Sequence, residues 1–399
     1  MKRLLFFLLL LAFLLSPASR AQGGEEAPSR TPLSPPLSFI PADSVALWTY
    51  LGNDVRALAA TAAPGTPAAD IGLPGGAGAD EAEQLQKLWH TYLPHFNAVG
   101  GGGDEQADPQ GIPSLYAFSL GALLFQLQGE ARYADAMERA LFNAAPRTLT
   151  DTAAGLPAEE LRAAAAVVLA APGAVYATTA DGGALYVNLY TNCTARLALQ
   201  GKRFVLDQIT DMPAAGGVKF RFMNLRDTLR LRMRLRMPDW TERRSDTGAS
   251  WAWAEAKRTP VRIFVNGHEL LRSEVDAAGY VEVERAWRSM DEVYIDFPLQ
   301  PQYVRRTDPA TGQAVRGALA LQIGPLVYQC SKVKPSWCAN ATLPFRYTGA
   351  LTPSGQNIVR GSLFDESAAP QDATAPEVDV RAIPYAEGEP GTVWLREIK

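Results

Sequence analysis

The pattern of hydrophobic and polar residues divides the chain into a helical part and a part rich in β-strands. Between residues 81 and 171 the apolar positions recur every three or four residues, which predicts helices. Tyr133, Met137 and Leu141, for example, lie four apart and would share one helix face. A further helix is expected to begin at Pro157 and to end at Pro172. The predicted helices cover residues 84–93, 115–127, 132–143 and 157–172.

From Ala184 onward the apolar residues alternate with polar ones, which predicts β-strands separated by turns. A block of helices followed by many short strands indicates an α+β multidomain protein, in which an antiparallel β-sandwich packs beside a helical region. The predicted strands cover residues 185–190, 202–209, 218–222, 228–237, 261–265, 280–283, 293–297 and 318–328.

The clearest strand covers residues 229–237, where leucines and methionines alternate with four arginines. Alternation places the apolar side chains on one face of the sheet and the arginines on the other. We expect the arginine face to meet solvent and to pair with acidic residues of neighbouring strands. Binding of an acidic polysaccharide or of a partner protein is the alternative.

The first 80 residues have the composition of a targeting segment and a linker. Lys2 and Arg3 precede an apolar run at 4–15, and small residues before Gln22 offer a cleavage site. Residues 1–21 are therefore predicted to be a signal peptide, which implies a secreted or extracytoplasmic protein that leaves the membrane after cleavage; an uncleaved anchor is the alternative. Residues 22–80 are rich in Ala, Gly and Pro, with one apolar island at 38–58, and are predicted to be a linker.

The charge of the chain argues against nucleic-acid binding, and its cysteines and sequons allow covalent modifications typical of secreted proteins. The formal charge is −4, and cleavage of the signal peptide would make the chain more acidic, so there is no electrostatic reason to expect nucleic-acid binding. In an oxidising compartment Cys330 and Cys338 are close enough in sequence to form a disulfide, which would leave Cys193 unpaired; three free buried thiols are the alternative. Asn192 and Asn340 open two sequons for N-glycosylation in a eukaryotic host.

Short motifs occur in an order that resembles the β-L-arabinofuranosidase family, glycoside hydrolase family 127 (GH127). In the helical part they are the stretches 85–89, 99–105 and 132–143, the last with the pattern RYAD followed by ERALFN. In the β-rich part they are ALYVNLY at 184–190, LRMPDW at 235–240, FVNG at 264–267, GY at 279–280 with RAW at 285–287, LALQIGPLVY at 319–328, AIPY at 382–385 and VWL at 393–395. The resemblance covers residues 81–395.

This resemblance implies a particular domain arrangement. The family's helical domain is an (α/α)6 barrel, and twelve helices need roughly 200 residues or more. The helical segment here is shorter, so we expect a partial barrel in an N-terminally shortened member; missing upstream sequence is the alternative. The predicted domains are a helical remnant at 81–182, a β-sandwich at 183–345 and a C-terminal segment at 346–399 that completes the β-region.

The resemblance also implies a catalytic site that this chain lacks in part. In the family a cysteine thiolate attacks the sugar, a glutamic acid protonates the leaving group, and zinc is held by three cysteines and a glutamate. The position of the family's Cys-Cys pair falls on Gly155 and Leu156, and no cysteine precedes Cys193. No zinc or other cofactor is therefore expected. Glu105 is the candidate acid/base residue, and an exposed loop carboxylate is the alternative for it.

Two functions follow from these observations. The first is a degenerate, non-catalytic protein that associates with carbohydrate or has a structural role. The second is a glycoside hydrolase that acts on plant-type or arabinose-containing glycans through carboxylates such as Glu105, with a partner such as Asp181. Trp251 and Trp253 are candidates for stacking on sugar rings, and core packing is the alternative. The ligand and the oligomeric state are left open.

Overall fold

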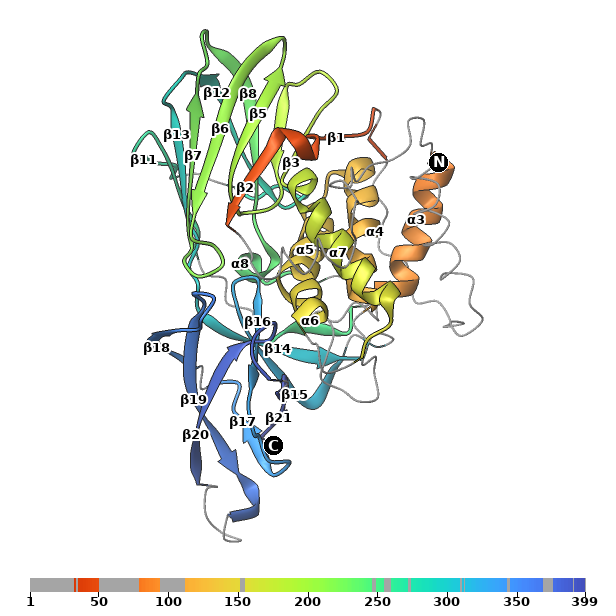
Figure 1. The fold of residues 1–399 in the computed structure, drawn as a ribbon, viewed down its shortest axis with the longest axis vertical. Coiled ribbons are helices and arrows are strands. Elements are labelled where there is room, and N and C mark those ends of the chain that lie inside the picture. The colour runs from red at the N-terminus through yellow and green to blue at the C-terminus, as the bar shows by residue number, and fades with distance from the viewer. Residues whose placement is uncertain are drawn as a thin grey trace.

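The computed structural model describes residues 32–33, 35–49, 79–93, 112–150, 155–245, 249–254, 260–271, 274–308, 311, 313–342, 345–368, 376–389 and 391–398. Figure 1 shows a two-sheet sandwich at one end of the molecule, a third sheet at the other end, and a group of helices against one side of both. The mixed helical and β-rich architecture predicted from the hydrophobic pattern is confirmed.

The sandwich is built from a five-stranded and a seven-stranded sheet. In β7 the side chains alternate between buried and half-buried positions, as expected for a sheet with one face in the core. Phe222 and Trp287 come from opposite sheets and stack with their ring centroids 4.6 Å apart, so aromatic packing joins the two layers. The five-stranded sheet has the order β1 (Ser38–Phe39), β3 (Tyr176–Thr178), β4 (Ala184–Val187), β8 (Leu229–Arg236) and β12 (Tyr280–Trp287). The seven-stranded sheet has the order β11 (His268–Glu269), β10 (Arg262–Val265), β13 (Glu292–Asp296), β7 (Gly217–Met223), β6 (Lys202–Thr210), β5 (Asn192–Leu199) and β2 (Val45–Thr49).

The third sheet has nine strands and curls, so that β16 at one end also pairs with β15. Its strands lie on both sides of residue 345, so the predicted sandwich at 183–345 is too long and the predicted boundary at 346 is wrong. The order is β16 (Leu326–Cys330), β20 (Glu377–Pro384), β19 (Asn357–Asp365), β17 (Trp337–Ala339), β21 (Trp394–Glu397), β15 (Ala314–Ile323), β14 (Pro301–Thr307) and β9 (Trp251–Trp253), and β18 (Arg346–Leu351) pairs with β19.

The strand predicted at 318–328 is in fact two strands. Ile323 at the end of β15 pairs with Leu326 at the start of β16, so the chain reverses direction between them. Gly324 has φ +55°, a conformation that glycine adopts without a steric penalty. The alternation of the sequence continues through this turn, which is why the pattern alone predicts a single strand.

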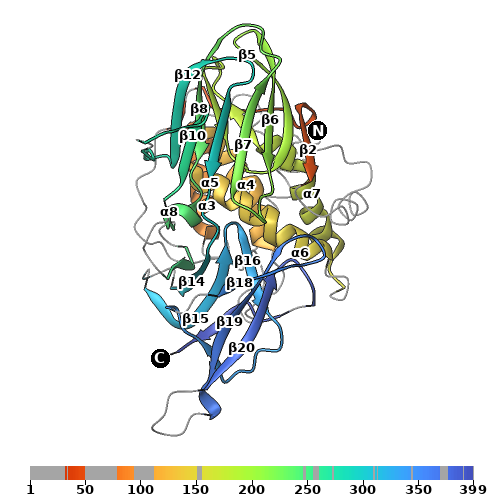
Figure 2. The same cartoon turned by 90° about the vertical axis from the view of Figure 1, so that its left-hand side faces the viewer.

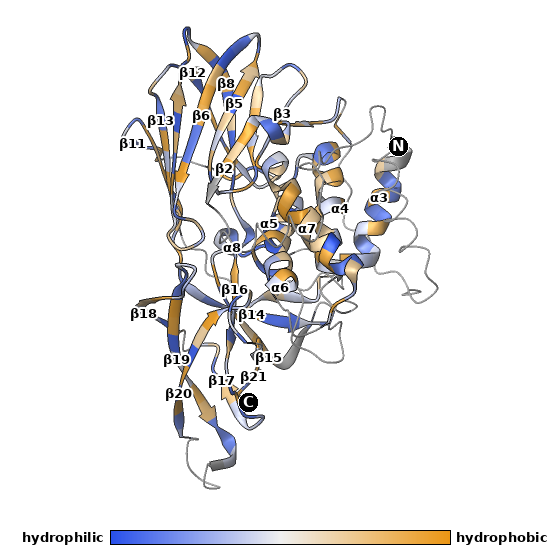
Figure 3. Cartoon of the chain, viewed as in Figure 1, coloured by the Kyte–Doolittle hydropathy of each residue, from blue (hydrophilic) through white to orange (hydrophobic). Residues whose placement is uncertain are grey.

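The helices match the predicted ones closely. They are α3 (Ala79–Tyr92), α4 (Ile112–Gln128), α5 (Ala131–Arg139), the π-helical segment Ala140–Ala144, α6 (Ala145–Thr150) and α7 (Ala158–Ala174), with short helices at Ala42–Ser44, Asp239–Glu242 (α8) and Glu366–Ala368. Figure 3 shows α7 as largely hydrophobic and α3 as more hydrophilic. Helix α7 continues to Ala174, past the predicted end, and contains Pro172 in its last turn. The described helices form a layer against the β-region (Figures 1 and 2), and the partial (α/α)6 barrel stays a prediction.

Part of the predicted linker belongs to the fold. β1 pairs with β3 in one sandwich sheet, and β2 pairs with β5 at the edge of the other. Leu37 and two residues of the apolar island, Ile40 and Val45, supply the reason, because they are buried in the core. The linker prediction is therefore wrong for residues 35–49. The predicted signal peptide lies outside the described residues, and none of the described helices is long and apolar enough to span a bilayer.

Candidate ligand pocket

A pocket of about 430 Å³ lies where the helices, the sandwich and the third sheet meet. Its wall comes from α3, α4, α5, the segment 239–251 and the turn at 277–278. The short helix α8 lies at this junction in both ribbon views (Figures 1 and 2). Small side chains leave the space open, and they are Ala117, Ala136, Ala140, Ala249, Ala277 and Ala278.

Beneath the pocket, a buried group of charged residues connects α5 to the sandwich. Arg236 on β8 is fully buried and donates hydrogen bonds to Asp135 and Glu138 on α5. The indole Nε1 of Trp240 donates to the second oxygen of Glu138 at 3.0 Å. These residues lie about 100 positions apart in the sequence, so only the fold brings them together.

The arginine face predicted for residues 229–237 is confirmed in part. Arg230 pairs with Glu284, and Arg234 pairs with Glu282, on the neighbouring strand β12. Arg236 is the exception, because this end of β8 faces the helices and the guanidinium is covered by α5. A buried arginine requires paired carboxylates, and here Asp135 and Glu138 supply them.

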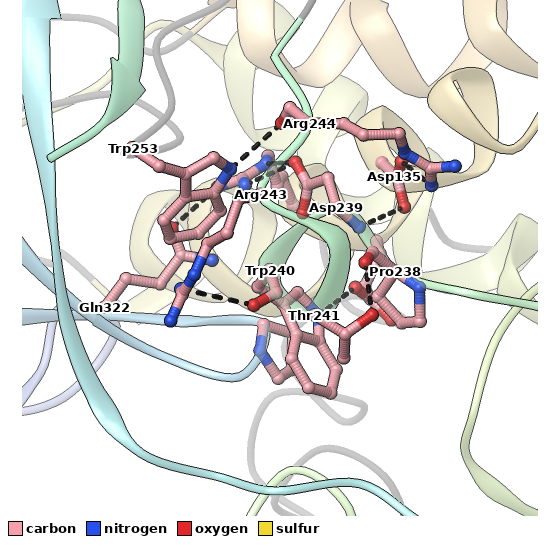
Figure 4. A network of polar contacts seen from close by, with 12 residues as sticks. Asp135, Pro238, Asp239, Trp240, Thr241, Arg243, Arg244, Trp253 and Gln322 are labelled. Atoms are coloured by element: carbon pink, nitrogen blue, oxygen red, sulfur yellow. Dashed lines mark hydrogen bonds and ion pairs between the residues drawn. The ribbon is translucent and has the colours of Figure 1, made fainter. Parts of the chain in front are cut away.

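A second buried ion pair forms part of the pocket wall. Arg139 donates from Nε and Nη2 to Oδ2 of Asp239 at 3.3 and 2.6 Å, and from Nη1 to Gln322 at 3.0 Å. The other carboxylate oxygen, Asp239 Oδ1, is buried and accepts no hydrogen bond from the described residues. Figure 4 shows Asp239 at the start of α8, with dashed lines to one of its two carboxylate oxygens. The side chain of Asp239 is 7% exposed and forms part of the pocket wall.

The pKa of the Asp135 carboxyl group is raised in this environment. Burial is the largest cause that raises its pKa, and repulsion by Asp239 raises it further. Arg236 and Arg244 act in the opposite direction, and the resulting pKa of Asp135 is about 7. One pocket carboxyl group therefore changes its protonation state near neutral pH.

Arginines also surround the outer part of the pocket. Arg132 pairs with Glu130 at 2.9 Å. Arg244 donates to the Met237 carbonyl and lies 3.6 Å from Asp135 Oδ2. The guanidinium of Arg243 lies 5.1 Å from the ring centroid of Trp253. The pocket therefore combines carboxylates, guanidinium groups and aromatic rings, a set that suits a polar, hydroxyl-rich ligand.

Comparison with known proteins finds a family model that is similar to part of the chain. Residues 184–299 match the family model described as "Beta-L-arabinofuranosidase, GH127 middle domain". This stretch is similar to the middle domain of GH127 proteins. The match contains the sandwich strands from β4 to β13, together with β9 of the third sheet, and the other strands of the third sheet follow it. No curated protein matches the GH127-like chain by sequence.

Three solved structures share the fold of the GH127-like chain. A GH127 β-arabinofuranosidase is 22% identical with a TM-score of 0.68, and the match covers 80% of this chain and 57% of that one. A GH127 β-L-arabinofuranosidase from Geobacillus stearothermophilus T6 is 20% identical with a TM-score of 0.61, over 86% and 59% of the two chains. A protein described as a glycoside hydrolase is 19% identical with a TM-score of 0.58, over 75% and 54%. The GH127-like chain thus spans less than two thirds of each of them.

The two tryptophans predicted for sugar stacking lie together at the pocket. Trp251 lines it and is 7% exposed, and one of its ring faces is covered by the Arg139 guanidinium at 4.4 Å. Trp253 packs edge-on against Trp251 at 5.6 Å, and its Nε1 donates to the Arg244 carbonyl at 2.9 Å. Contacts with other protein side chains therefore cover much of both rings. Sugar stacking stays a prediction.

The other predicted catalytic positions do not meet at this pocket. Glu105 lies outside the described residues. Gly155 and Leu156 precede α7 and are not part of the pocket wall. Asp181 lies in the turn between β3 and β4, where hydrogen bonds from the Thr179 hydroxyl and the Gly183 amide lower its pKa. Asp181 thus stabilises a turn and does not face the pocket.

The three cysteines are free, and the predicted Cys330–Cys338 disulfide is wrong. Cys330 is on β16 and Cys338 is on β17; β20 and β19 stand between them in one direction around the sheet, and β15 and β21 in the other. With strands roughly 4.8 Å apart, this separation exceeds the reach of a disulfide. Burial raises the pKa of Cys193 and of Cys330 to about 12, and it also raises that of Cys338.

The two sequon asparagines lie at strand ends and are half-buried. Asn192 is the first residue of β5, and the hydroxyl of Thr194 in the same sequon donates to Asp207 at 2.7 Å. Asn340 follows β17, and its Oδ1 accepts hydrogen bonds from the amide and the hydroxyl of Thr342. Glycosylation at both positions stays a prediction.

Asp135, Arg139 and Asp239 were not predicted as site residues from the sequence. The available signal was their position in two of the motifs that carry the GH127 resemblance, the stretches 132–143 and 235–240. Nothing in either stretch shows that they meet, because their contact spans 100 residues.

Proposed function

We propose that this GH127-like chain binds carbohydrate in the pocket and does not use cysteine–zinc catalysis. The observation that carries the proposal is the position of the thiols. Cys193, Cys330 and Cys338 are all buried within sheets, and none of them lines the pocket. A thiol is nucleophilic as the thiolate, and a raised pKa keeps all three protonated near neutral pH.

The donor set does not fit the zinc that the family resemblance implies. Three cysteine sulfurs would have to converge on one metal ion at about 2.3 Å. Here Cys193 is on β5 in the seven-stranded sheet, whereas the other two thiols are on separate strands of the third sheet. Within the described ranges no three His, Cys, Asp or Glu side chains cluster in a way that could hold a metal. This supports a function that does not depend on a zinc-bound thiolate.

The chemistry of the pocket supports carbohydrate as the ligand. Sugars present hydroxyl groups that donate to carboxylates and accept from guanidinium groups. Asp239 offers a carboxylate in the pocket wall, and Arg243 and Arg244 offer donors near the opening. Two of the similar structures are described as β-arabinofuranosidases, so arabinose-containing glycans are the first ligands to test.

A carboxylate hydrolase is the second candidate function. Glycoside hydrolysis needs one carboxyl group that is protonated at working pH and a second that is ionised. Asp135 has a pKa of about 7 and lies beside Asp239, whose backbone N–H donates to Asp135 Oδ1 at 3.3 Å. The alternative role of Glu105 can be tested with the same assays.

Two assays on the full chain test the proposal. We expect no release of p-nitrophenol from p-nitrophenyl β-L-arabinofuranoside, and calorimetric binding of arabino-oligosaccharides. Asp239→Asn should weaken that binding, whereas Asp181→Asn, a matched change in an exposed turn, should leave it unchanged. Turnover that disappears in Asp239→Asn or in Glu105→Gln would establish the hydrolase instead. Absence of binding to every arabino-oligosaccharide would contradict the proposed ligand.

Two further parts of the proposal, the absence of zinc and secretion, can be measured directly. Elemental analysis after dialysis against a mild chelator should find less than stoichiometric zinc, and one zinc per chain would contradict a zinc-free function. Secretion after cleavage of residues 1–21 predicts a mature N-terminus at Gln22, which N-terminal sequencing of protein from the culture medium would check.

A further inference from the structure

One part of the pocket wall holds a carboxylate and a guanidinium group next to each other. Asp135 on α5 and Arg244 after α8 both line the pocket, and Asp135 Oδ2 lies 3.6 Å from Arg244 Nη2. Figure 4 shows the Arg244 guanidinium beside Asp135, whereas the Arg243 side chain lies on the opposite side of Asp239. Asp135 and Arg244 thus form an acid–base pair at one defined place in the pocket.

The two carboxylate oxygens of Asp135 have different surroundings. Oδ1 accepts hydrogen bonds from Arg236 and from the backbone N–H of Asp239. Oδ2 accepts none from the described residues, because Arg244 Nη2 is beyond hydrogen-bond distance. In contrast to Asp239 Oδ1, Asp135 Oδ2 is also not enclosed by the protein. Oδ2 is therefore the atom of Asp135 that a ligand in the pocket can reach.

Arg244 places hydrogen-bond donors beside this acceptor. Its side chain is 33% exposed, and its contacts with Asp135 and with the Met237 carbonyl both use Nη2. Within the described part of the chain, the N–H groups of Nη1 are therefore available to a ligand. Sugars carry neighbouring hydroxyl groups that can each donate and accept. One ligand hydroxyl can donate to Asp135 Oδ2 while its neighbour accepts from Arg244.

The protonation state of Asp135 decides whether this acceptor exists. The charged groups that act on it come from its own helix, from β8 and from the segment around α8, and they are Glu138, Arg236, Asp239 and Arg244. The other charged residues of the pocket wall are Glu130, Arg132, Arg139 and Arg243. Burial and repulsion by Asp239 raise the pKa of Asp135 to about 7, against the opposite effect of the arginines.

The proton has one suitable position on this carboxyl group. Oδ1 already accepts two hydrogen bonds, so a proton is expected on Oδ2. Protonation therefore turns the oxygen that a ligand can reach from an acceptor into a donor. A hydroxyl bound to the ionised form makes a charge-assisted hydrogen bond, which is stronger than a bond between neutral groups. Ligand hydroxyls should thus favour the ionised form.

We infer that ligand hydroxyls bind at the pair of Asp135 and Arg244, and that sugar binding releases a proton from Asp135, so that the pocket binds its ligand more tightly as the pH rises. The inference rests on the proposed carbohydrate-binding function and adds its pH dependence. It also identifies the part of the pocket wall that recognises the ligand.

Titration calorimetry of the full chain with arabinotriose tests the pH dependence. Binding should be roughly tenfold weaker at pH 6 than at pH 8.5, because only the ionised fraction of Asp135 is competent to bind. Titrations in buffers with different ionisation enthalpies count the protons exchanged, and they should show release of about one proton per bound ligand at pH 6. Equal affinities at both pH values, or tighter binding at pH 6, would overturn the inference and leave the proposed function standing. Absence of binding at every pH would overturn both.

Variants assign the pH dependence to this pair. Arg244→Gln should move the midpoint of the pH dependence to higher pH, because Arg244 lowers the pKa of Asp135. Arg230→Gln, on an exposed side chain of β8 outside the pocket wall, should keep the midpoint of the wild type. Asp135→Asn should bind arabinotriose equally at pH 6 and pH 8.5. An unchanged midpoint in Arg244→Gln, or the same shift in Arg230→Gln, would contradict the assignment even if Asp135→Asn does not fold.

Discussion

Arg236 on β8 and Glu138 on α5 form an ion pair between two side chains that are both almost fully buried. They lie 98 residues apart in the sequence, and Glu138 uses its other oxygen to accept a hydrogen bond from Trp240. Asp135, one helical turn before Glu138, binds the second Nη atom of the same guanidinium. A single arginine thus attaches the helical layer to the sandwich next to the pocket.

Substitution of Arg236 should lower the free energy of unfolding. Arg236→Gln would leave Asp135 and Glu138 buried without their cation, and removing one partner of a buried ion pair costs about 3–5 kcal/mol. Urea unfolding followed by circular dichroism should show this decrease in the free energy of unfolding. Arg230→Gln is the matched control, because Arg230 is 82% exposed in its pair with Glu284 and should change stability by about 1 kcal/mol or less. If both substitutions lowered the free energy of unfolding equally, the buried ion pairs of Arg236 would not stabilise the fold more than the exposed pair of Arg230.

The raised pKa of Asp135 should make stability depend on pH. In the unfolded chain an aspartate titrates near 3.8, whereas in the folded protein the pKa is about 7, so the folded state holds an extra proton between these values. The contribution of Asp135 to stability is therefore fully present below pH 4 and is lost as the pH rises to about 7. Unfolding free energies measured from pH 4 to pH 8 should fall more steeply in the wild type than in Asp135→Asn. Parallel curves would show that Asp135 does not titrate in this range.

The thiols should be unreactive in the folded protein. Because Cys193, Cys330 and Cys338 are buried and have raised pKa values, a water-soluble aromatic disulfide reagent should label none of them under native conditions. In guanidinium chloride without reductant, all three should react. Release of a single equivalent under those conditions would indicate a disulfide after all, and rapid labelling of the native protein would contradict burial of the thiols.

Local patterns in the sequence were enough to predict most helices and strands. The alternation in residues 229–237 correctly predicts β8 and its apolar face, because that face packs inside the sandwich along its whole length. The same rule fails at Arg236, where burial comes from a helix distant in sequence. It also fails at Gly324, where a turn interrupts an alternation that continues on both sides.

The candidate pocket could not be predicted in the same way. Its floor depends on contacts between α5 and α8, such as that between Arg139 and Asp239, and periodicity contains no information on which distant residues meet. The disulfide prediction failed for a related reason. Cys330 and Cys338 are eight residues apart, but the chain turns so that they lie on strands that are not neighbours.

Gly279 makes close contacts with the pocket residue Arg244 and with Ala131 at the start of α5. It adopts φ +90°, and a Cβ atom there would lie 2.2 Å from Nη1 of Arg244 and 2.6 Å from Cβ of Ala131. Gly267 in the turn between β10 and β11 has a similar φ of +80°, but a Cβ atom there would meet nothing within 4 Å. The two glycines therefore share the backbone strain that a substitution introduces and differ in the available space.

Gly279→Ala should be more damaging than Gly267→Ala. Both substitutions force a residue with a Cβ atom into the left-handed region, which costs about 1–2 kcal/mol. Gly279→Ala should cost about 1–3 kcal/mol more, because overpacking moves the Arg244 guanidinium or the α5 backbone at Ala131. Denaturant unfolding of both variants measures the difference. Since Arg244 lines the pocket, calorimetry should also show weaker binding of arabino-oligosaccharides to Gly279→Ala, whereas Gly267→Ala should bind like the wild type. Equal stability and equal binding in the two variants would mean that Arg244 moves freely and that its position is not set by packing on Gly279.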